Sequence, residues 1–543
     1  MSSRRDWREL AAVVLGFGIL TMTLTWPLAL HLGTVARADN GDGRISIWNV
    51  AWVARTLVID PLHVFDANIF YPHRGTLAYS ESNLGAGILA IPVYWATRNP
   101  YTAHNVVFLL SFVLSAVGTY YLVRYLAEDR RAAVIAATCF AYCPYAFGHT
   151  PHIQLLMTAG LPFSMLALHR LVDRPTSRRG AALGLAMAAQ ALCCGYYAVF
   201  VTLMVGFAVL VVASLRRLWK DARFWRAILV GAAVAIAVAL PLFAPYVGLQ
   251  RTTGFHRSLD DAREWSANWP AYLASSSSAH VRLLRGNGTA IEVLFPGFVA
   301  GAFGIAGLAI GWAARGRGRE TAIVYGALAL LAFWASFGPA AGLYGVLYQV
   351  LPVFNLLHAP SRFGLVVVFA LSVLAGLSIS ALLRKQRTSM LAAAVLLMAT
   401  VVELRVPLSF RPVPPVDPAY RVLAGLPYGA VIEMPVYSRR FAFARTQYML
   451  SSTAHWMPLV NAYSDYIPQD FTDNAAVLGG FPSRESFAIL NRDHVRYAVF
   501  HLDLFDPPAR LDVLARLREF DRYLVQRYGD ERTRLFEIVG APP

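Results

Sequence analysis

The sequence is dominated by apolar segments that are long enough to cross a lipid bilayer. A crossing helix needs about 20 predominantly apolar residues, because its backbone polar groups can be satisfied only within the helix. This pattern predicts a mainly α fold, a polytopic transmembrane bundle of about eleven spans. The expected spans are 9–30, 101–124, 132–148, 153–170, 180–195, 197–215, 227–248, 293–313, 320–337, 362–383 and 388–405. The stretch 180–215 fits either a hairpin turning near Cys193–Gly195 or one long helix.

The composition agrees with a lipid-facing surface. Hydrophobic residues make up 57% of the chain and charged residues only 15%, whereas soluble domains carry about 25% charged residues. The net charge is +16, but the basic residues form short clusters between apolar segments and no continuous patch. This distribution is typical of membrane topology and argues against a nucleic-acid partner.

The basic clusters also predict an orientation. Arginines precede the first expected span, and further clusters follow the second, fourth, sixth, eighth and tenth: Arg130–Arg131, Arg174–Arg179, Arg216–Arg223, Arg315–Arg319 and Arg384–Arg387. Cytoplasmic loops carry the excess of Lys and Arg. We therefore expect a cytoplasmic N-terminus and an extracytoplasmic C-terminal region.

Two domains and a linker follow from this topology. Residues 1–405 form the membrane domain, with a long outward loop at 31–100, and the proline-rich residues 406–418 form a linker. Residues 419–543 are expected to fold as a small outward-facing α/β domain. Its strand-like runs are Ala430–Met434, Tyr497–Leu502 and Arg534–Val539, and its helical pattern covers Ala509–Tyr523. Within the outward loop, the apolar stretch Leu84–Thr97 is too short to span and is expected at the membrane interface.

The first outward loop concentrates carboxylates. Asp39 and Asp42 lie in a glycine-rich turn just after the first expected span, and Glu81 follows in the same loop. A carboxylate at the membrane surface can act as a general base toward a hydroxyl, or help to hold a divalent ion beside a phosphate. The alternative is that Asp39 and Asp42 only cap the helix that follows.

Two further motifs carry polar residues near expected outward ends of spans. GHTPHIQLL contains His149, His152 and Gln154, which could bind a ligand or only form interfacial hydrogen bonds. HAPSRF contains Arg362, whose guanidinium could grip a phosphate with two N–H groups or only reach the lipid headgroups. Glu292 precedes LFPG in another outward loop.

In the C-terminal domain, the run TQYMLSSTAHWMPLVNAYSDY contains Tyr448, His455, Trp456 and Asn461. Aromatic and amide side chains together suit stacking and hydrogen bonding to sugars, but they also suit a half-buried sheet edge. The sequence has no Walker A loop, Gly-x-Ser-x-Gly elbow, dinucleotide fingerprint or HExxH helix, which disfavours ATP-driven transport and hydrolase chemistry.

Taken together, these features resemble the GT-C superfamily of membrane glycosyltransferases. The segments GDGRISIWNVAW, ANIFYPHRGTLAYSE, GHTPHIQLL, HAPSRF and STAHWMPLVNAYS further resemble a bacterial group of GT-C-like membrane proteins. The resemblance implies a multi-pass protein of the bacterial cytoplasmic membrane. It also implies transfer of a hexose or pentose from a polyprenyl-phosphate donor to an acceptor at the outer face.

The resemblance also implies roles for individual residues. The catalytic acid of the first outward loop falls on Asp42, with Asp39 second in order and Glu81 as an assisting carboxylate. Arg362 or His152 would hold the phosphate. Because the sequence has no tight Asp-x-Asp, we assign no metal ligands and leave a divalent cation open. The expected partners are a lipid-linked sugar donor, membrane lipids and a glycan, lipid or protein acceptor.

A function of a different class fits the same scaffold. A non-catalytic lipid or polysaccharide transporter, or an assembly factor, would be expected to carry charged residues near the midplane of several spans. The expected spans are nearly free of such residues, which favours chemistry at the outer surface.

Overall fold

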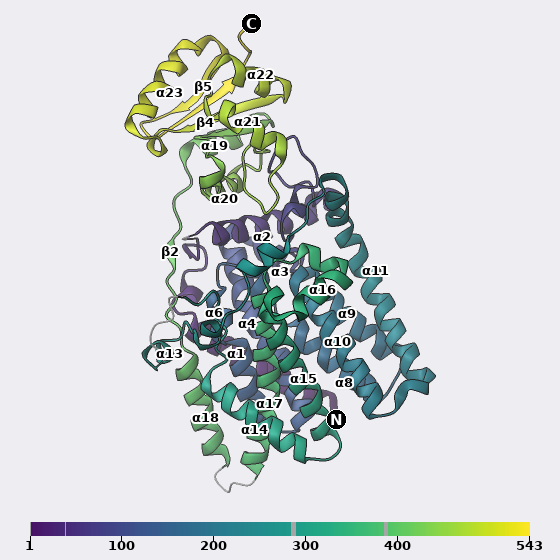
Figure 1. Cartoon of the computed structure of the whole chain (residues 1–543). Helices are drawn as coiled ribbons and strands as arrows, with labels where there is room; N and C mark the ends of the chain where they lie inside the picture. The colour runs from purple at the N-terminus through teal and green to yellow at the C-terminus, as the bar shows by residue number, and fades with distance from the viewer. Residues whose placement is uncertain (1, 39, 284–288, 385–388) are drawn as a thin grey trace. The chain divides into compact units, whose positions relative to one another are not determined.

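The computed structural model describes residues 2–38, 40–283, 289–384 and 389–543. Its contacts divide the chain into two compact units, each of which is discontinuous in sequence (Figure 1). Unit 1 contains Met1–Leu30, Val107–Ala244 and Gln250–Ser409, and unit 2 contains His31–Val106, Pro245–Leu249 and Phe410–Pro543. Unit 2 thus gathers the predicted outward loop with the C-terminal residues, a grouping that hydropathy alone does not reveal.

Unit 1 is a bundle of helices, as its apolar segments predict. Its longer helices are α1 (Ser2–Leu24), α4 (Pro100–Ala127), α5 (Arg130–Ala141), α8 (Gly160–Asp173), α9 (Ser177–Cys193), α10 (Gly195–Leu215), α11 (Ala222–Thr253), α14 (Phe298–Ala313), α15 (Arg317–Ser336), α17 (Gly364–Arg384) and α18 (Ser389–Leu404). Of α4, the residues from Val107 onward belong to unit 1. Short helices include α6 (Pro144–Gly148), α7 (Ile153–Leu156) and α16 (Leu343–Val350).

Six helical segments in the described part of the chain are long and apolar enough to cross a membrane. They are Asp6–Leu24, Pro100–Ala127, Ile153–Asp173, Gly195–Leu215, Ala222–Thr253 and Pro360–Arg384. The chain is thus a multi-pass membrane protein of mainly helical fold. Helices α14 and α18 are apolar but shorter, so the total of eleven spans stays a prediction.

Some expected spans are broken. The stretch 180–215 is two helices that meet at Cys194, whose backbone is extended (φ −162°, ψ 122°), and is not one long helix. The expected span 132–148 is not continuous either, because α5 ends at Ala141 and α6 begins at Pro144. Proline has no N–H to donate and disfavours a helical conformation in the residue before it, which explains the break.

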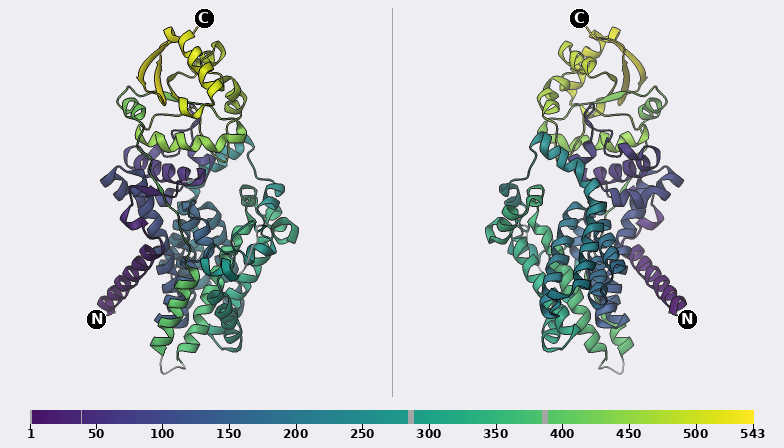
Figure 2. Two further views of the ribbon diagram at one scale, coloured as in Figure 1. Left: turned by 90° about the vertical axis from the view of Figure 1, so that its left-hand side faces the viewer. Right: turned by 90° about the vertical axis from the view of Figure 1, so that its right-hand side faces the viewer.

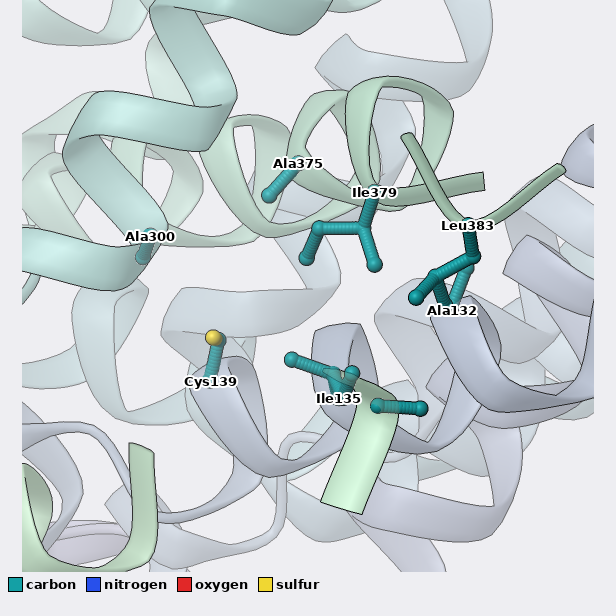
Figure 3. Close-up of a cluster of buried hydrophobic side chains, with 8 residues drawn as sticks. Ala132, Ile135, Cys139, Ala300, Ala375, Ile379 and Leu383 are labelled. Carbon is teal, nitrogen blue, oxygen red and sulfur yellow. The ribbon is translucent and has the colours of Figure 1, made fainter. Parts of the chain in front are cut away.

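Small residues allow the helices of unit 1 to approach closely. A Cβ on Gly307 of α14 would lie 1.9 Å from the carbonyl oxygen of Leu374 of α17, so only glycine fits there. Nearby, buried side chains of α5, α14 and α17 form one cluster, which includes Ile135, Cys139 and Ile379 (Figure 3). By contrast, α1 leans away from the other helices of unit 1 toward its N-terminal end (Figure 2).

Unit 2 contains a four-stranded sheet in the order β3-β4-β6-β5. The strands are β3 (Ala430–Met434), β4 (Val495–His501), β5 (Leu524–Gly529) and β6 (Thr533–Ile538). β3 and β4 are parallel, and the other neighbours are antiparallel. The three predicted strands are present at β3, β4 and β6, and the predicted helix is α23 (Pro507–Glu519). Strand β5 was not predicted, because most of its residues are exposed.

Unit 2 also contains helices from the first outward loop and from the C-terminal residues. The loop residues supply α2 (Gly41–Ile59) and α3 (Leu84–Thr97), and the C-terminal residues supply α20 (Thr446–Ser451), α21 (Gln469–Gly479) and α22 (Arg484–Arg492). The bounds of α3 match the apolar stretch found in the sequence. A short antiparallel pair joins β1 (Val35–Ala36) to β2 (Arg411–Pro412), which ties the middle of the linker to the loop.

Candidate functional site

Asp42 lies in the first turn of α2. The N-cap of this helix is Asn40, whose side-chain Oδ1 accepts a hydrogen bond from the Gly43 N–H at 2.9 Å. Capping is therefore performed by Asn40, and the half-buried Asp42 carboxylate is placed at the helix N-terminus, where the helix dipole favours a negative charge. Asp39 lies outside the described residues.

Steric crowding explains why the two residues that flank Asp42 are glycines. A Cβ on Gly43 would lie 1.7 Å from the carbonyl oxygen of Arg37, and a Cβ on Gly41 would lie 2.1 Å from the ring of Phe443. Real Cβ atoms cannot come this close, so a Cβ at Gly43 would clash with the backbone and a Cβ at Gly41 would force the Phe443 ring to move. The turn thus fixes the backbone on both sides of the candidate catalytic carboxylate.

These contacts predict different responses at the two glycines. Gly43→Ala should destabilise unit 2 by roughly 1–3 kcal/mol or more, since a backbone carbonyl cannot move aside cheaply. Gly41→Ala should be relieved by adding Phe443→Ala, which removes the clashing ring. Thermal unfolding of the purified variants measures both effects. Equal losses for Gly41→Ala with and without Phe443→Ala would contradict this account of the turn.

Glu81 lies in a loop that is fastened to α2. The side-chain amide of Asn49, about 10 Å along the helix from Asp42, donates to the Glu81 carbonyl oxygen at 2.9 Å. On either side, the Tyr246 hydroxyl donates to the Ser80 carbonyl oxygen at 3.1 Å and accepts from the Ser82 N–H at 3.0 Å. The Ser80 hydroxyl donates to a carboxylate oxygen of Asp465 at 2.7 Å.

The partners of this loop were not predicted from the sequence. Tyr246 is far from Glu81 along the chain, and Asp465 comes from the C-terminal residues. Only the fold brings them together. In unit 2, therefore, α2 carries Asp42 in its first turn and bonds the backbone of the Glu81 loop through Asn49.

In unit 1, His149 and Glu292 form a buried pair. The Nε2 atom of His149 lies 3.2 Å from a carboxylate oxygen of Glu292, and Nδ1 lies 2.9 Å from the Tyr145 carbonyl oxygen. Burial acts to raise the pKa of the Glu292 carboxyl. The charge and hydrogen bond of His149, the Val293 N–H and the charge of Arg362 outweigh this effect and hold that pKa below its usual range.

Arg362 belongs to the same electrostatic neighbourhood. Its guanidinium lies 4.2 Å from the ring centroid of Tyr196, over the face of that ring. The Tyr196 hydroxyl in turn accepts from the His358 N–H and bonds His358 Nδ1, both at 2.8 Å. Arg362 lies in the 3-10 turn Pro360–Phe363, directly before α17.

The other residues of GHTPHIQLL lie beside this group. The rings of His149 and His152 are 6.0 Å apart, centroid to centroid, and Gln154 is in the short helix α7. Within the described ranges, no three His, Cys, Asp or Glu side chains are grouped so that they could hold a metal ion. His149, Glu292 and Arg362 thus come together, and Tyr196 and His358 are partners that the sequence did not single out.

The C-terminal candidates are mostly engaged in packing. Asn461 is fully buried, and its amide bonds the Glu433 backbone twice, at 2.9 and 2.8 Å, along the edge of β3. Tyr448 donates to the Pro435 carbonyl oxygen, and Trp456 packs against Trp52 at 5.8 Å. These contacts fit the sheet-edge alternative, and sugar contact stays a prediction for these residues.

His455 shares an aromatic cluster with a buried ionisable pair. Burial lowers the pKa of His455 to about 3, and its ring stacks on Tyr420. The Tyr420 hydroxyl and His501 Nε2 both bond the same carboxylate oxygen of Glu433, at 3.3 and 2.8 Å. Burial acts to lower the pKa of His501, but the hydrogen bond and charge of Glu433 raise it. This pair was not predicted, because its members are 68 residues apart.

Three solved structures share this fold. Arabinofuranosyltransferase AftD from Mycobacteria aligns with 98% of this chain at a TM-score of 0.60 and 15% identity, although the chain spans only 41% of AftD. ArnT from Cupriavidus metallidurans aligns with 98% of this chain and 100% of its own, at a TM-score of 0.52 and 14% identity. The oligosaccharyltransferase AglB from Archaeoglobus fulgidus aligns with 96% of this chain and 73% of its own length, at a TM-score of 0.51 and 13% identity.

The chain has a GT-C-like fold. The resemblance inferred from the sequence is thereby confirmed at the level of the fold. No family model and no curated protein matches the sequence. At such low identities the structural likeness concerns the fold, so an argument about function must rest on the residues of this chain.

Proposed function

We propose that this chain is a GT-C glycosyltransferase that moves a sugar from a polyprenyl-phosphate donor to an acceptor at the outer face of the membrane. The observation that carries the proposal is the position of Asp42, a carboxylate at a helix N-terminus between two glycines that cannot be replaced without a clash. Such a carboxylate is held in place for proton transfer. The GT-C-like fold gives it a context in a membrane enzyme.

In the proposed reaction, an acceptor hydroxyl attacks the anomeric carbon of the donor sugar. Asp42 accepts the proton of that hydroxyl, the new glycosidic bond forms, and the bond between the anomeric carbon and the phosphate oxygen breaks. The polyprenyl phosphate leaves with the bonding electron pair. Glu81 is the proposed assisting carboxylate. A divalent cation stays an open component of the reaction, with no ligands assigned to it.

Arg362 and the histidines are proposed to bind the donor phosphate. The Arg362 guanidinium lies over the Tyr196 ring, and its planar set of N–H groups suits two phosphate oxygens. Ionised Glu292 bonds His149 and so orients its ring, while His152 and Gln154 extend the polar group. In unit 2, the proposed contacts to the acceptor or sugar are Tyr448, His455, Trp456 and Asn461.

A donor screen tests the proposed function. The purified protein in liposomes is given polyprenyl-phosphate hexoses and pentoses together with lipid and glycan acceptors, and released polyprenyl phosphate is measured. We expect release with at least one donor, above the level of empty liposomes. Movement of the donor across the bilayer without any release would instead support the transporter alternative.

The proposed orientation makes its own prediction. If the Arg-rich loops are cytoplasmic, a reporter fused at Arg317 should lie inside the cell and one fused at Pro415 outside. Alkaline phosphatase, which is active only outside, should therefore work at Pro415 and fail at Arg317, and green fluorescent protein should behave in the opposite way. The same side for both fusions would overturn the proposed topology.

A further inference from the structure

Unit 2 contains a buried arginine, Arg445, whose side chain bonds backbone carbonyl groups. Arg445 is only 2% exposed. Its Nε donates to the Tyr437 carbonyl oxygen at 3.1 Å, its Nη2 bonds the same oxygen, and its Nη1 reaches the Ala462 carbonyl oxygen at 3.4 Å. The guanidinium lies over the ring of Phe471 at 4.7 Å. Among the described residues, no carboxylate forms an ion pair with it.

This arrangement leaves a charge uncompensated. Burial lowers the pKa of Arg445 to about 10, which is still well above neutral, so the group remains a cation. Buried charges in proteins are normally paired, because isolated ones are costly to remove from water. A guanidinium has five N–H groups, and three form the bonds named above, so two are left for another acceptor.

Arg445 lines a pocket of about 390 Å³. One wall is the face of α21 that carries Phe471, Thr472 and Ala475, and small residues on this face leave the space unfilled. A second arginine, Arg439, also lines the pocket, and Ser438 adds a hydroxyl. None of the described lining residues is acidic. The pocket therefore combines two cations, hydroxyl groups and an aromatic ring.

We propose that this pocket binds a sugar that carries an oxyanion, either a carboxylate or a phosphate. The oxyanion would pair with Arg445 and Arg439, since charge-assisted bonds from guanidinium groups to oxyanions are short and strong. The hydroxyls of Ser438 and Thr472 would bond the sugar hydroxyls. The volume lies in the range of small-molecule sites, about 300–1,000 Å³. This site goes beyond glycosyl transfer and does not depend on Asp42 or Arg362.

The competing explanation is that Arg445 only fastens the Tyr437 and Ala462 carbonyl groups. Substituting Arg445 alone cannot separate these explanations, because the variant could fail to fold. Two other changes act on the pocket without removing that fastening. Arg439→Gln removes the exposed lining cation, and Ala475→Leu fills the space. Arg440→Gln is the matched control, because Arg440 is the adjacent exposed arginine and does not line the pocket.

Calorimetric titration of the purified full-length protein tests the proposal with glucuronate, glucose 6-phosphate and glucose at matched ionic strength. We expect at least one anionic sugar to bind and glucose to bind at least tenfold more weakly. Arg439→Gln should weaken the anion about tenfold, Ala475→Leu should abolish binding, and Arg440→Gln should stay within twofold of the wild type. Binding of glucuronate alone or of glucose 6-phosphate alone would identify the oxyanion.

Three results would overturn the proposal. They are the absence of binding by the wild type, unchanged affinity in Ala475→Leu, and equal weakening by Arg439→Gln and Arg440→Gln. The glycosyltransferase proposal is independent of all three, because the donor screen reads a different product. Ala475→Leu should also leave release of polyprenyl phosphate unchanged, which separates a failure of this site from a failure of the enzyme assignment.

Discussion

Asp42→Asn is expected to lower sugar transfer by about 10²–10⁴-fold, the usual contribution of a general base. The amide keeps the shape of the carboxylate but cannot take a proton from the acceptor hydroxyl near neutral pH. The fold should be preserved, because the N-cap of α2 is Asn40 and asparagine keeps the shape of the Asp42 side chain. We therefore expect an unchanged unfolding midpoint together with the loss of transfer, both measured on the purified protein.

Asp66→Asn provides a matched control for this change. Asp66 is a half-buried carboxylate of the same loop, and its oxygen accepts a hydrogen bond from the Gly75 N–H at 2.7 Å. Asparagine can still accept that bond, so transfer should stay near the wild-type rate. If Asp42→Asn keeps transfer within tenfold of the wild type, the base is not Asp42, and Asp39 and then Glu81 become the next candidates.

Arg362→Ala is expected to weaken binding of the polyprenyl-phosphate donor by about 10- to 100-fold, since hydrogen bonds to charged groups contribute about 1.5–3 kcal/mol. Arg362→Lys should lie between the wild type and Arg362→Ala, because lysine keeps the charge but lacks the two-pronged geometry. Binding of a fluorescent donor analogue measures both variants without requiring turnover.

Tyr196→Phe separates phosphate binding from local packing. This change keeps a ring beneath Arg362 but removes the two hydrogen bonds with His358. It should therefore cost stability and affect the donor affinity far less than Arg362→Ala does. Donor affinities that are equal in the wild type and in Arg362→Ala would show that Arg362 is an interfacial anchor.

The sequence predicted those helices and strands that are defined by the hydrophobic pattern of a few neighbouring residues. The bounds of β3 and α3 agree with runs found in the sequence, because β3 is buried throughout and α3 is bounded by polar residues. The interruptions at Cys194 and before Pro144 were harder to predict. Hydropathy stays high across a break in the backbone, so apolar windows merge neighbouring helices into a single expected span.

The candidate site residues also divide into those that the sequence predicted and those that only the structure reveals. The sequence singled out Asp42, His149, Glu292 and Arg362 by residue type, and the structure pairs His149 with Glu292 near Arg362. Tyr246, Asp465 and the Glu433–His501 pair were missed because contacts between residues far apart in sequence leave no local pattern. Arg445 was missed for another reason. A buried arginine cannot be told from an exposed one by its neighbours in the chain.

The most direct test of the central claim counts two products of one reaction. Proteoliposomes receive a donor labelled separately in its sugar and in its lipid, and the transferred sugar and released polyprenyl phosphate are measured over time. We predict one polyprenyl phosphate per transferred sugar in the wild type, and loss of both products together in Asp42→Asn. Equal amounts of both products in the wild type and in Asp42→Asn would contradict this account.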